Sequence, residues 1–391
     1  MPDEKYDIVV VGAGPGGSMA AAAAASEGAK TLMLERDSNI GLPVRCGEAV
    51  GINNIKRFCD IDSRWVAAEI EGMNVYSPDG TEVSVSEEGQ FGAVLERSLF
   101  DRYLAELAAA AGADIRTRSN VDGLILKQGS VKGVTVSRFN KRSSIKADLV
   151  IAADGVESRI GRWAGIRTQI SARDLESAYQ IVISDIDYDY KRCHFYLGDD
   201  VAPGGYLWVF PKGKRTASVG IGVEVSICSP GEAHRKLESF ILKHFGKPAV
   251  IGEMAGGVPC AKPIKQPYAD GILLVGDAAH HCNPLTGGGI FTAMVSGNEA
   301  GKLAAEAVSK GDTSIRELKK FNKRIEKEII RPHKRSYRLA SAVSKLSDEV
   351  MNKTAQEINS IPPEKRTLRN IFLKGLASQP KLVVDVIAAF I

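Results

Sequence analysis

A short apolar run followed at once by closely spaced glycines, DIVVVGAGPGG at residues 7–17, constrains the fold of this chain more than any other stretch. The β-branched run predicts a buried parallel strand, and the alanine-rich segment after it predicts a helix that ends near Gly28. The sequence KTLMLE, residues 30–35, predicts a second strand. Strand, glycine turn, helix and strand together predict a βαβ unit of the Rossmann type.

The glycine spacing Gly12-x-Gly14-x-x-Gly17 indicates that this unit binds a dinucleotide. Gly12 permits the tight turn, Gly14 lets the backbone approach a pyrophosphate, and Gly17 lets helix and strand pack closely. Backbone amides at the helix start would then hold the phosphates. Glu35, at the end of the second strand, would accept hydrogen bonds from an adenosine ribose and repel a 2′-phosphate. The ligand is therefore expected to be NAD or FAD rather than NADP.

Three later segments favour FAD: AADGVESRIGRWAG at 152–165, GILLVGDAAHHCNPLTGGGIFTAMVSG at 271–297, and a helix that begins Glu96-Arg97. Through its GxGxxG, DG and GD motifs the chain resembles the para-hydroxybenzoate hydroxylase-like FAD superfamily. The resemblance implies that Asp277 binds the ribitol hydroxyls and that Arg97 lies near the diphosphate. In physical terms, PLTGGGI offers free backbone amides at a helix start, and these would stabilise an anionic reduced flavin.

The stretch PGGYLWVFP, residues 203–211, places Tyr206, Trp208 and Phe210 at alternate positions, and therefore on one face of a strand. Such a face is either packed core or the wall of an apolar cavity. A substrate lobe that accompanies a flavin lobe needs a wall, and aromatic side chains provide area with little rotamer freedom to lose. We therefore expect these three side chains to bind substrate.

The pattern PxxYxWxFP in that stretch resembles the signature of the geranylgeranyl reductase family, and RCGEAV, residues 45–50, resembles the family's cysteine-bearing loop beside the flavin. The resemblance covers nearly the whole chain and is closest to archaeal enzymes that saturate the geranylgeranyl chains of ether lipids. It implies an FAD-dependent oxidoreductase that acts on carbon–carbon double bonds, with reduced ferredoxin or NAD(P)H as electron donor. It also implies further cofactor-binding residues, namely Ala13, Gly16, Cys46, Gly47, Ala49, Val121, Gly289 and Ile290.

Several assignments stay open at this point. Cys46 or an ordered water is the expected proton donor to the alkene, although an isolated loop cysteine is usually inert. His280 and His281 are either structural or carry protons. The alternative functions are a flavin monooxygenase or halogenase, a chlorophyll-pathway geranylgeranyl reductase, and a lipid carrier that retains FAD. The W-x-W-x-I-P pattern of flavin-dependent halogenases differs here at Tyr206 and Phe210.

The expected fold class is α/β, with a Rossmann-type FAD-binding lobe, an inserted, mainly antiparallel β-sheet substrate lobe and a helical C-terminal region. The FAD-binding lobe is expected to be discontinuous, at residues 1–72, 93–170 and 271–310. The substrate lobe is expected at 73–92 and 171–270, because SAYQIVISDID and TASVGIGVEV alternate in β-type residues. Residues 311–391 are expected to be helical and charged.

Composition excludes several classes of function. A net charge of +4 over 391 residues, with no basic patch interleaved with aromatics, argues against nucleic acid as a partner. The six cysteines lack C-x-x-C or zinc spacing, so we expect reduced thiols and no metal site. The start MPDEKYD is not a signal peptide and no apolar run reaches the roughly 18–20 residues of a membrane span, which predicts a cytoplasmic location. The basic segments 318–338 and 364–370 are either solvated faces or peripheral contacts with anionic lipid headgroups.

Overall fold

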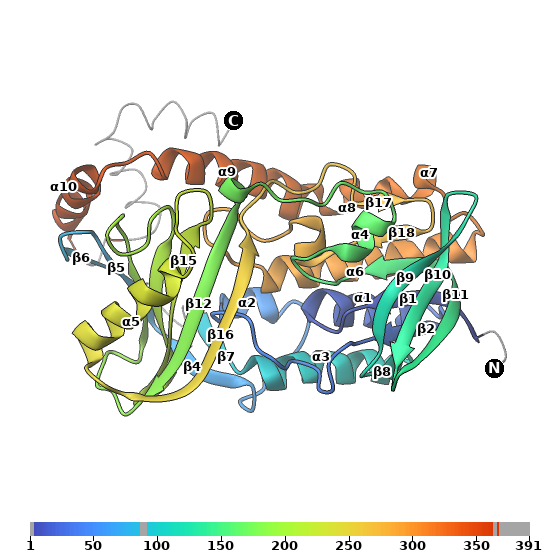
Figure 1. The fold of residues 1–391 in the computed structure, drawn as a ribbon, viewed down its shortest axis with the longest axis horizontal. Helices are drawn as coiled ribbons and strands as arrows, with labels where there is room; N and C mark the ends of the chain where they lie inside the picture. Colours follow the sequence, from blue (N-terminus) through green and yellow to red (C-terminus); the bar gives the residue numbers. More distant parts are fainter. Residues whose placement is uncertain (1–3, 87–91, 363–365, 367–391) are drawn as a thin grey trace. The chain divides into compact units, whose positions relative to one another are not determined.

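The computed structural model of the chain describes residues 4–86, 92–362 and 366. The chain divides into two compact units, and each unit is assembled from three segments (Figure 1). Unit 1 comprises residues up to 44, 97–170 and 261–334. Unit 2 comprises residues 45–96, 171–260 and those from 335 onward. The predicted basic segment 364–370 lies outside the described residues apart from Arg366.

Unit 1 is built on a mainly parallel sheet with the strand order β17-β18-β11-β1-β2-β8. The five strands from β18 to β8 are parallel, and β17 joins this edge antiparallel to β18. The strand pair β1 and β2 with the helix between them is the βαβ unit that the sequence predicts. The strands are β1 (Glu4–Val11), β2 (Thr31–Leu34), β8 (Asp114–Arg116), β11 (Lys141–Ala152), β17 (Tyr268–Ala269) and β18 (Ile272–Leu274).

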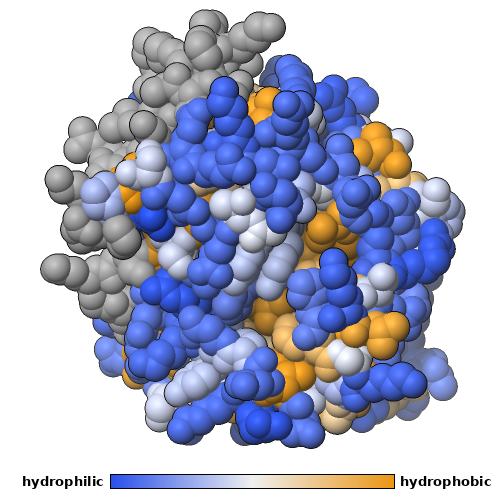
Figure 2. Space-filling view, turned by 90° about the vertical axis from the view of Figure 1, so that its left-hand side faces the viewer, coloured by the Kyte–Doolittle hydropathy of each residue, from blue (hydrophilic) through white to orange (hydrophobic). Residues whose placement is uncertain are grey.

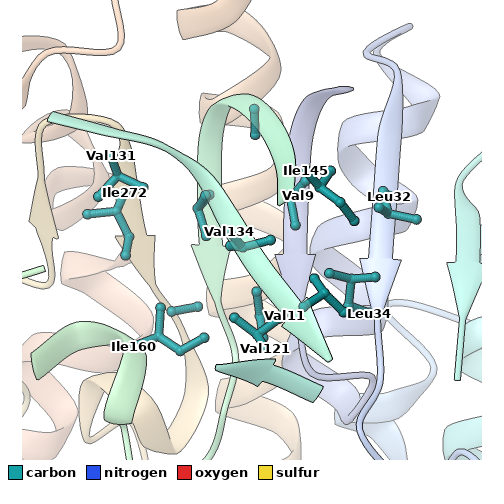
Figure 3. Packing of buried hydrophobic residues seen from close by; sticks show 14 of the residues in the cluster. Val9, Val11, Leu32, Leu34, Val121, Val131, Val134, Ile145, Ile160 and Ile272 are labelled. Carbon is teal, nitrogen blue, oxygen red and sulfur yellow. The ribbon is translucent and has the colours of Figure 1, made fainter. Parts of the chain in front are cut away.

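One face of this sheet is covered by an antiparallel pair, β9 (Asn120–Lys127) and β10 (Ser130–Arg138), of which β10 continues the hydrogen bonding of β11. Figure 3 shows apolar side chains of β1 and β2 facing those of this pair and Ile160 of the short helix α4 (Arg159–Trp163). Alternate residues of β1 therefore point into this cluster, as the side-chain period of a strand requires. The members that Figure 3 labels are Val9, Val11, Leu32, Leu34, Val121, Val131, Val134, Ile145, Ile160 and Ile272.

The glycines and alanines of α1 (Pro15–Ser26) let it pack closely against α6 (Ile290–Ser309). A Cβ on Gly297 would lie 2.1 Å from the carbonyl oxygen of Gly16, and a Cβ on Gly301 would lie 2.3 Å from that of Ala20. Neither position tolerates a side chain, so the two helices are in backbone contact. The helix α3 (Arg97–Ala110) also packs against α1.

The C-terminal part of unit 1 is helical. It contains α7 (Ile315–Leu318), α8 (Lys320–Ile325), a π-helical turn (Glu326–Ile330) and the start of α9 (Arg331–Val343). Phe321, Ile325 and Ile329 are fully buried. These buried positions recur every four residues, so they share one side of the helical segment.

Unit 2 is built on a seven-stranded sheet with the order β16-β12-β15-β14-β13-β5-β6, in which only the pair β13–β5 is parallel. The helix α5 (Glu232–Phe245) packs on one face of this sheet. The α10 helix (Asp348–Asn359) also belongs to this unit. The strands are β5 (Gly72–Tyr76), β6 (Glu82–Ser86), β12 (Leu175–Ser184), β13 (Arg192–Tyr196), β14 (Tyr206–Gly213), β15 (Thr216–Glu224) and β16 (Ala249–Pro259).

A second, three-stranded antiparallel sheet in unit 2 consists of β3 (Ala49–Val50), β7 (Gly92–Leu95) and β4 (Val66–Ile70). Residues 45–72 and 93–96, which the expected FAD-binding lobe includes, belong to unit 2. Residues 261–270 and 311–334 in turn lie in unit 1. The α/β fold class itself is confirmed.

The surface is mixed in character. Figure 2 shows one face of the molecule that is mostly hydrophilic, with several separate hydrophobic patches. Among the described residues no helix combines the length and the hydropathy that crossing a bilayer requires.

Candidate functional site

The glycine turn after β1 has the geometry that a pyrophosphate-binding turn requires. Gly12 has φ +100°, and a Cβ there would lie 2.3 Å from the carbonyl oxygen of Ala153. A Cβ on Gly17 would lie 1.8 Å from the carbonyl oxygen of Gly12. A Cβ on Gly14 would meet no protein atom within 4 Å. The fold therefore requires glycine at 12 and 17, while Gly14 leaves open space at the start of α1, where a ligand can approach.

Glu35 is held by backbone amides on both of its carboxylate oxygens. Ala13 N donates to Oε2 and Asp37 N donates to Oε1, each over 2.9 Å. The carboxylate thus spans from the glycine turn to the end of β2, and its remaining lone pairs can accept from a ribose. Gly16 lies deeper in α1, where a Cβ would sit 3.4 Å from the carbonyl oxygen of Ala293 in α6.

The second part of the unit 1 site lies at the start of α6. Asp277 belongs to a short 3₁₀ turn (Gly276–Ala279) after β18, and burial raises the pKa of its carboxyl while the positive charge of Arg97 opposes this shift. A Cβ on Gly289 would lie 3.2 Å from Asp277 Oδ1, so the carboxylate faces the first residues of α6. Arg97 itself makes two 2.7 Å hydrogen bonds to Asp101. This pair fixes the guanidinium at the start of α3.

These features fit FAD. The helix starts at Gly14 and Gly289 carry no side-chain cap, an arrangement that suits an anionic ligand bound by helix-start amides. Among the described residues the buried oxygen Asp154 Oδ1 has no hydrogen-bond partner. Asp154 stands in the DG motif, where burial raises the pKa of the carboxyl.

Val121 and Ile290 are mostly buried residues of unit 1. Val121 packs into the cluster of Figure 3 and is 8% exposed, and Ile290, the first residue of α6, is 7% exposed. A role of either residue at the cofactor stays a prediction.

In unit 2 the strand β14 has two chemically different faces. Leu207 and Val209 pack with α5. Trp208 and Phe210 lie on the opposite side in a cluster with Val94 and Ile70, and Tyr206 packs against it. We call the side formed by Tyr206, Trp208 and Phe210 the aromatic face. Trp208 is 8% and Phe210 6% exposed, so only Tyr206 keeps substantial accessible surface.

The cysteine loop lies directly on the aromatic face. A Cβ on Gly47 would approach the Phe210 ring to 3.0 Å and Trp208 Nε1 to 3.3 Å. Gln180, from β12, accepts from Trp208 Nε1 over 3.0 Å and donates to the carbonyl oxygen of Cys46 over 3.2 Å. The structure therefore brings Cys46 and Gly47 together with the predicted substrate-binding residues in one unit, and Ala49 follows in β3.

Gln180 and Glu176, which no sequence motif singles out, share a face of β12 with each other and with Ala178. The pKa of Glu176 is raised to about 7, chiefly by burial and in part by nearby Glu224, while a hydrogen bond with Cys260 opposes the shift. A Cβ on Gly222 would lie 2.5 Å from Glu176 Oε2. The two-residue alternation in LESAYQIVIS indicates that these residues share a face. It does not indicate that the Glu176 carboxyl is buried there.

The histidines after the GD motif are buried in unit 1. His280 Nε2 lies 3.2 Å from the carbonyl oxygen of Thr168, and His333 Nε2 lies 3.0 Å from that of His281. Burial lowers the pKa of His281 to about 3, with His333 and His280 adding to the effect. Within the described part of the chain neither ring nitrogen of His281 has a hydrogen-bond partner. These contacts favour a structural role for a neutral His281.

Comparisons with known proteins place these features in a family. A model of the geranylgeranyl reductase catalytic domain matches residues 174–258, and a model of FAD-dependent oxidoreductases matches residues 7–199. A digeranylgeranylglycerophospholipid reductase of Methanothrix thermoacetophila is 42% identical over 97% of this chain and 98% of the relative.

Solved structures agree with this placement. A geranylgeranyl bacteriochlorophyll reductase-like protein from Thermoplasma acidophilum has a TM-score of 0.94 at 37% identity, covering 99% of both chains. A halogenase solved in complex with FAD has a TM-score of 0.69 at 18% identity, over 90% of this chain and 79% of its own. The halogenase shares the fold alone.

Proposed function

This chain belongs to the geranylgeranyl reductase family of FAD-dependent oxidoreductases, and on that premise we propose that it reduces the carbon–carbon double bonds of geranylgeranyl chains on an archaeal ether-lipid precursor. The observation that carries the proposal is the aromatic face of unit 2. Support also comes from full-length relatives that are named digeranylgeranylglycerophospholipid reductases.

The aromatic face suits a substrate that has almost no polar groups. An isoprenoid chain offers no hydrogen bonds, so a surface that binds it must have its own polar atoms satisfied elsewhere. Trp208 meets this condition, because its indole N–H is bonded to Gln180. The rings of Trp208 and Phe210 stack at 6.0 Å, and Tyr206 meets Trp208 edge-on at 5.8 Å. The three rings thus form one continuous aromatic cluster, and Tyr206 provides most of its accessible surface.

FAD bound in unit 1 and reduced by the electron donor would supply the hydride chemistry, and saturation of the double bond also requires a proton. In unit 1 the start of α1 would hold the pyrophosphate, Glu35 the ribose and Asp277 the ribitol hydroxyls. In unit 2 Cys46 is the proposed proton source. An isolated alkene accepts hydride poorly, so protonation must precede or accompany the transfer.

The test is anaerobic turnover of the purified flavoprotein with a digeranylgeranylglycerophospholipid. We expect products heavier by one hydrogen molecule for each bond reduced, detected by mass spectrometry. Asp277→Asn, which keeps the side chain's shape and removes a charged acceptor for ribitol, should lose flavin and activity together. Oxygen-dependent hydroxylation or halogenation of an aromatic substrate, without alkene reduction, would contradict the proposal.

Reduced ferredoxin and NAD(P)H are both kept as the proposed electron donor. Mixing each donor anaerobically with the oxidised protein, while following the flavin absorbance, distinguishes them. Rapid bleaching by only one donor identifies it. If neither donor reduces the flavin at least as fast as the enzyme turns over, both assignments are contradicted.

The proposed substrate also suggests peripheral contact with a membrane. The exposed side chains of Lys319, Lys323, Lys327, Arg331 and Lys334 recur along the helical segment of unit 1, opposite the buried line of Phe321, Ile325 and Ile329. The apolar side of the segment is packed in the protein, so this basic face can bind only by charge. Lysines near an anionic lipid surface each strengthen binding by about 1 kcal/mol.

Co-sedimentation with vesicles tests this contact. The protein should bind vesicles that contain anionic lipid, and binding should weaken with added salt. Lys323→Glu/Lys327→Glu should reduce the binding constant by at least tenfold, whereas Lys127→Glu/Lys141→Glu, which reverses two exposed lysines outside the segment, should not. Equal loss in both double variants would indicate a response to net charge alone.

A further inference from the structure

The loop from Cys46 to Glu48 rests on three successive side chains of the aromatic face and its continuation. Trp208 reaches the carbonyl oxygen of Cys46 through Gln180, the Phe210 ring lies over Gly47, and Lys212 reaches Glu48. Residues 208 and 210 point to the same side because the side-chain period of a strand is two. The pairing of β14 is irregular between Pro211 and Gly213, and the contact of Lys212 with Glu48 places this side chain at the same loop. Each of the three loop residues is therefore linked to a different residue of β14.

Lys212 is a buried lysine whose three donors are all used. Its Nζ lies 2.9 Å from Glu48 Oε2, 2.9 Å from Glu96 Oε2 and 2.7 Å from the carbonyl oxygen of Leu95. The side chains of Lys212 and Glu48 are 9% and 3% exposed. A buried ion pair of this kind is weak evidence for stability in itself, because desolvation offsets much of the attraction. The ion pair does, however, fix the position of Glu48 in the loop.

Glu48 has a backbone conformation that disfavours a side chain. Its φ is +69°, in the left-handed region where non-glycine residues are uncommon. Two contacts hold it there, namely the Lys212 ion pair on its side chain and the hydrogen bond from Leu95 N to its carbonyl oxygen over 2.9 Å. Such conformations persist only where surrounding contacts determine them.

The backbone of Glu48 also places a donor at the thiol. The amide N of Glu48 lies 3.2 Å from Cys46 Sγ. An N–H donor favours the thiolate over the thiol, and the thiolate is the reactive form. The direction of this N–H follows the orientation of the Gly47–Glu48 peptide. The loop that contains this peptide is anchored at Cys46 by Gln180 and at Glu48 by Lys212 and Leu95. The ion pair two residues along the chain therefore acts on the thiol through the backbone.

We propose that Lys212 and Glu48 are positioning residues for Cys46, because their buried ion pair holds the loop so that the Glu48 amide is aimed at Sγ. The pair acts on the thiol through the backbone amide of Glu48 and not through either charged side chain. A role of the thiol in alkene reduction rests on the proposed function, whereas its reactivity can be measured without substrate.

The experiment measures alkylation of Cys46 by iodoacetamide in the FAD-loaded protein, from neutral to alkaline pH, by mass spectrometry of the Cys46 peptide. Lys212→Met/Glu48→Gln removes the ion pair and leaves no unpaired charge at either position. We expect the pH of half-maximal alkylation to rise by at least half a unit, which is about threefold less thiolate on the rising limb. Lys212→Arg should restore most of the original profile.

Two controls are matched to this design. Lys191→Met removes an ion pair of the same unit, with Glu71 at 2.6 Å, whose side chains are more than half exposed. It should leave the Cys46 profile unchanged. Cys59, a thiol of unit 2 whose pKa burial raises to about 11, serves as the internal reference and should react equally in all variants.

The outcomes separate the possibilities. A double variant with the parent's flavin content and melting temperature and an unchanged Cys46 profile would overturn the proposal. If the double variant does not fold, Glu48→Gln, which keeps the shape of the side chain and weakens only its charge, must shift the profile in the same direction, and no shift overturns the proposal. A shifted profile in a protein that cannot reduce geranylgeranyl chains would reject the proposed function and retain the positioning role.

Discussion

The indole N–H of Trp208 donates a 3.0 Å hydrogen bond to the side-chain oxygen of Gln180, and both residues are buried, at 8% and 3% exposure. The tryptophan of the aromatic signature therefore has two roles at once. Its ring contributes hydrocarbon surface, and its nitrogen holds the glutamine that supports the cysteine loop. A substitution at Trp208 therefore affects the aromatic cluster and the support of the cysteine loop together.

Trp208→Phe separates these roles, since it keeps most of the ring and removes the donor. We expect a loss of roughly 1–3 kcal/mol in the free energy of unfolding, because Gln180 Oε1 is left buried without a partner. Thermal or denaturant unfolding measures it. In a double-mutant cycle with Gln180→Met the two losses should not add. Full additivity would show that the hydrogen bond contributes nothing.

Tyr206 is the member of the aromatic face best suited to test substrate contact, because it is the most exposed of the three. Tyr206→Ala should leave flavin content and melting temperature close to those of the parent. Alkene reduction should fall on the order of tenfold to a hundredfold or move to a different double bond, since a misplaced chain reacts poorly. A melting temperature that drops while the product pattern stays the same would identify Tyr206 as packing alone.

The glycine turn offers a matched pair of substitutions. Gly14→Ala should fold normally, because its φ of −72° suits alanine and no protein atom lies within 4 Å of the new methyl. It should nevertheless bind FAD at least about tenfold more weakly, since the methyl occupies the space at the helix start. Gly17→Ala should destabilise the protein itself, by about 1–3 kcal/mol or more. Fluorescence titration with FAD and thermal melts of the apoprotein distinguish the two, and parent-like FAD affinity in Gly14→Ala would count against this site.

Glu176 gives unit 2 a pH dependence of known sign. Its pKa is raised by burial to about 7, so the folded state binds the proton more tightly than the unfolded chain. The stabilisation is complete below about pH 4.5 and is lost as the pH rises toward 7. Glu176→Gln should therefore match the parent near pH 4.5 and exceed its stability near pH 8 by up to about 3 kcal/mol.

Melting curves at both pH values check this expectation. Glu27→Gln, at an exposed position, is the control and should show no such difference. A constant offset between Glu176→Gln and the parent at all pH values would mean that the carboxyl is ordinarily ionised.

The parts of the site that the sequence predicted are those set by local geometry. Gly12, Gly14, Gly17 and Glu35 lie within one βαβ unit, where a few residues of sequence determine the turn. The alternation of β14 was equally readable, because the face of a strand follows from its period. Family resemblance supplied Asp277 and the FAD assignment.

The parts that it did not predict depend on pairing between distant segments. The β3-β7-β4 sheet places residues 45–72 in unit 2 and brings the cysteine loop onto β14, more than 150 positions along the chain. Lys212 and Glu48 read as ordinary surface charges in the sequence, and only burial reveals them as a pair. The same holds for Glu176, whose raised pKa comes from its environment.

The backbone contact between α1 and α6 has a consequence for the length of the ligand. The helices run in the same direction, since Gly16 meets Gly297 and Ala20 meets Gly301, and α6 begins about one turn, ~5 Å, beyond the start of α1. The contacting glycines thus fix how far the N-terminus of α6 is displaced along the helix axes from the N-terminus of α1. A residue inserted between Ile290 and Ala293 would rotate the start of α6 by about 100°. We expect such a protein to keep its fold and to bind the proposed cofactor more weakly, because the amides at the start of α6 would point in another direction.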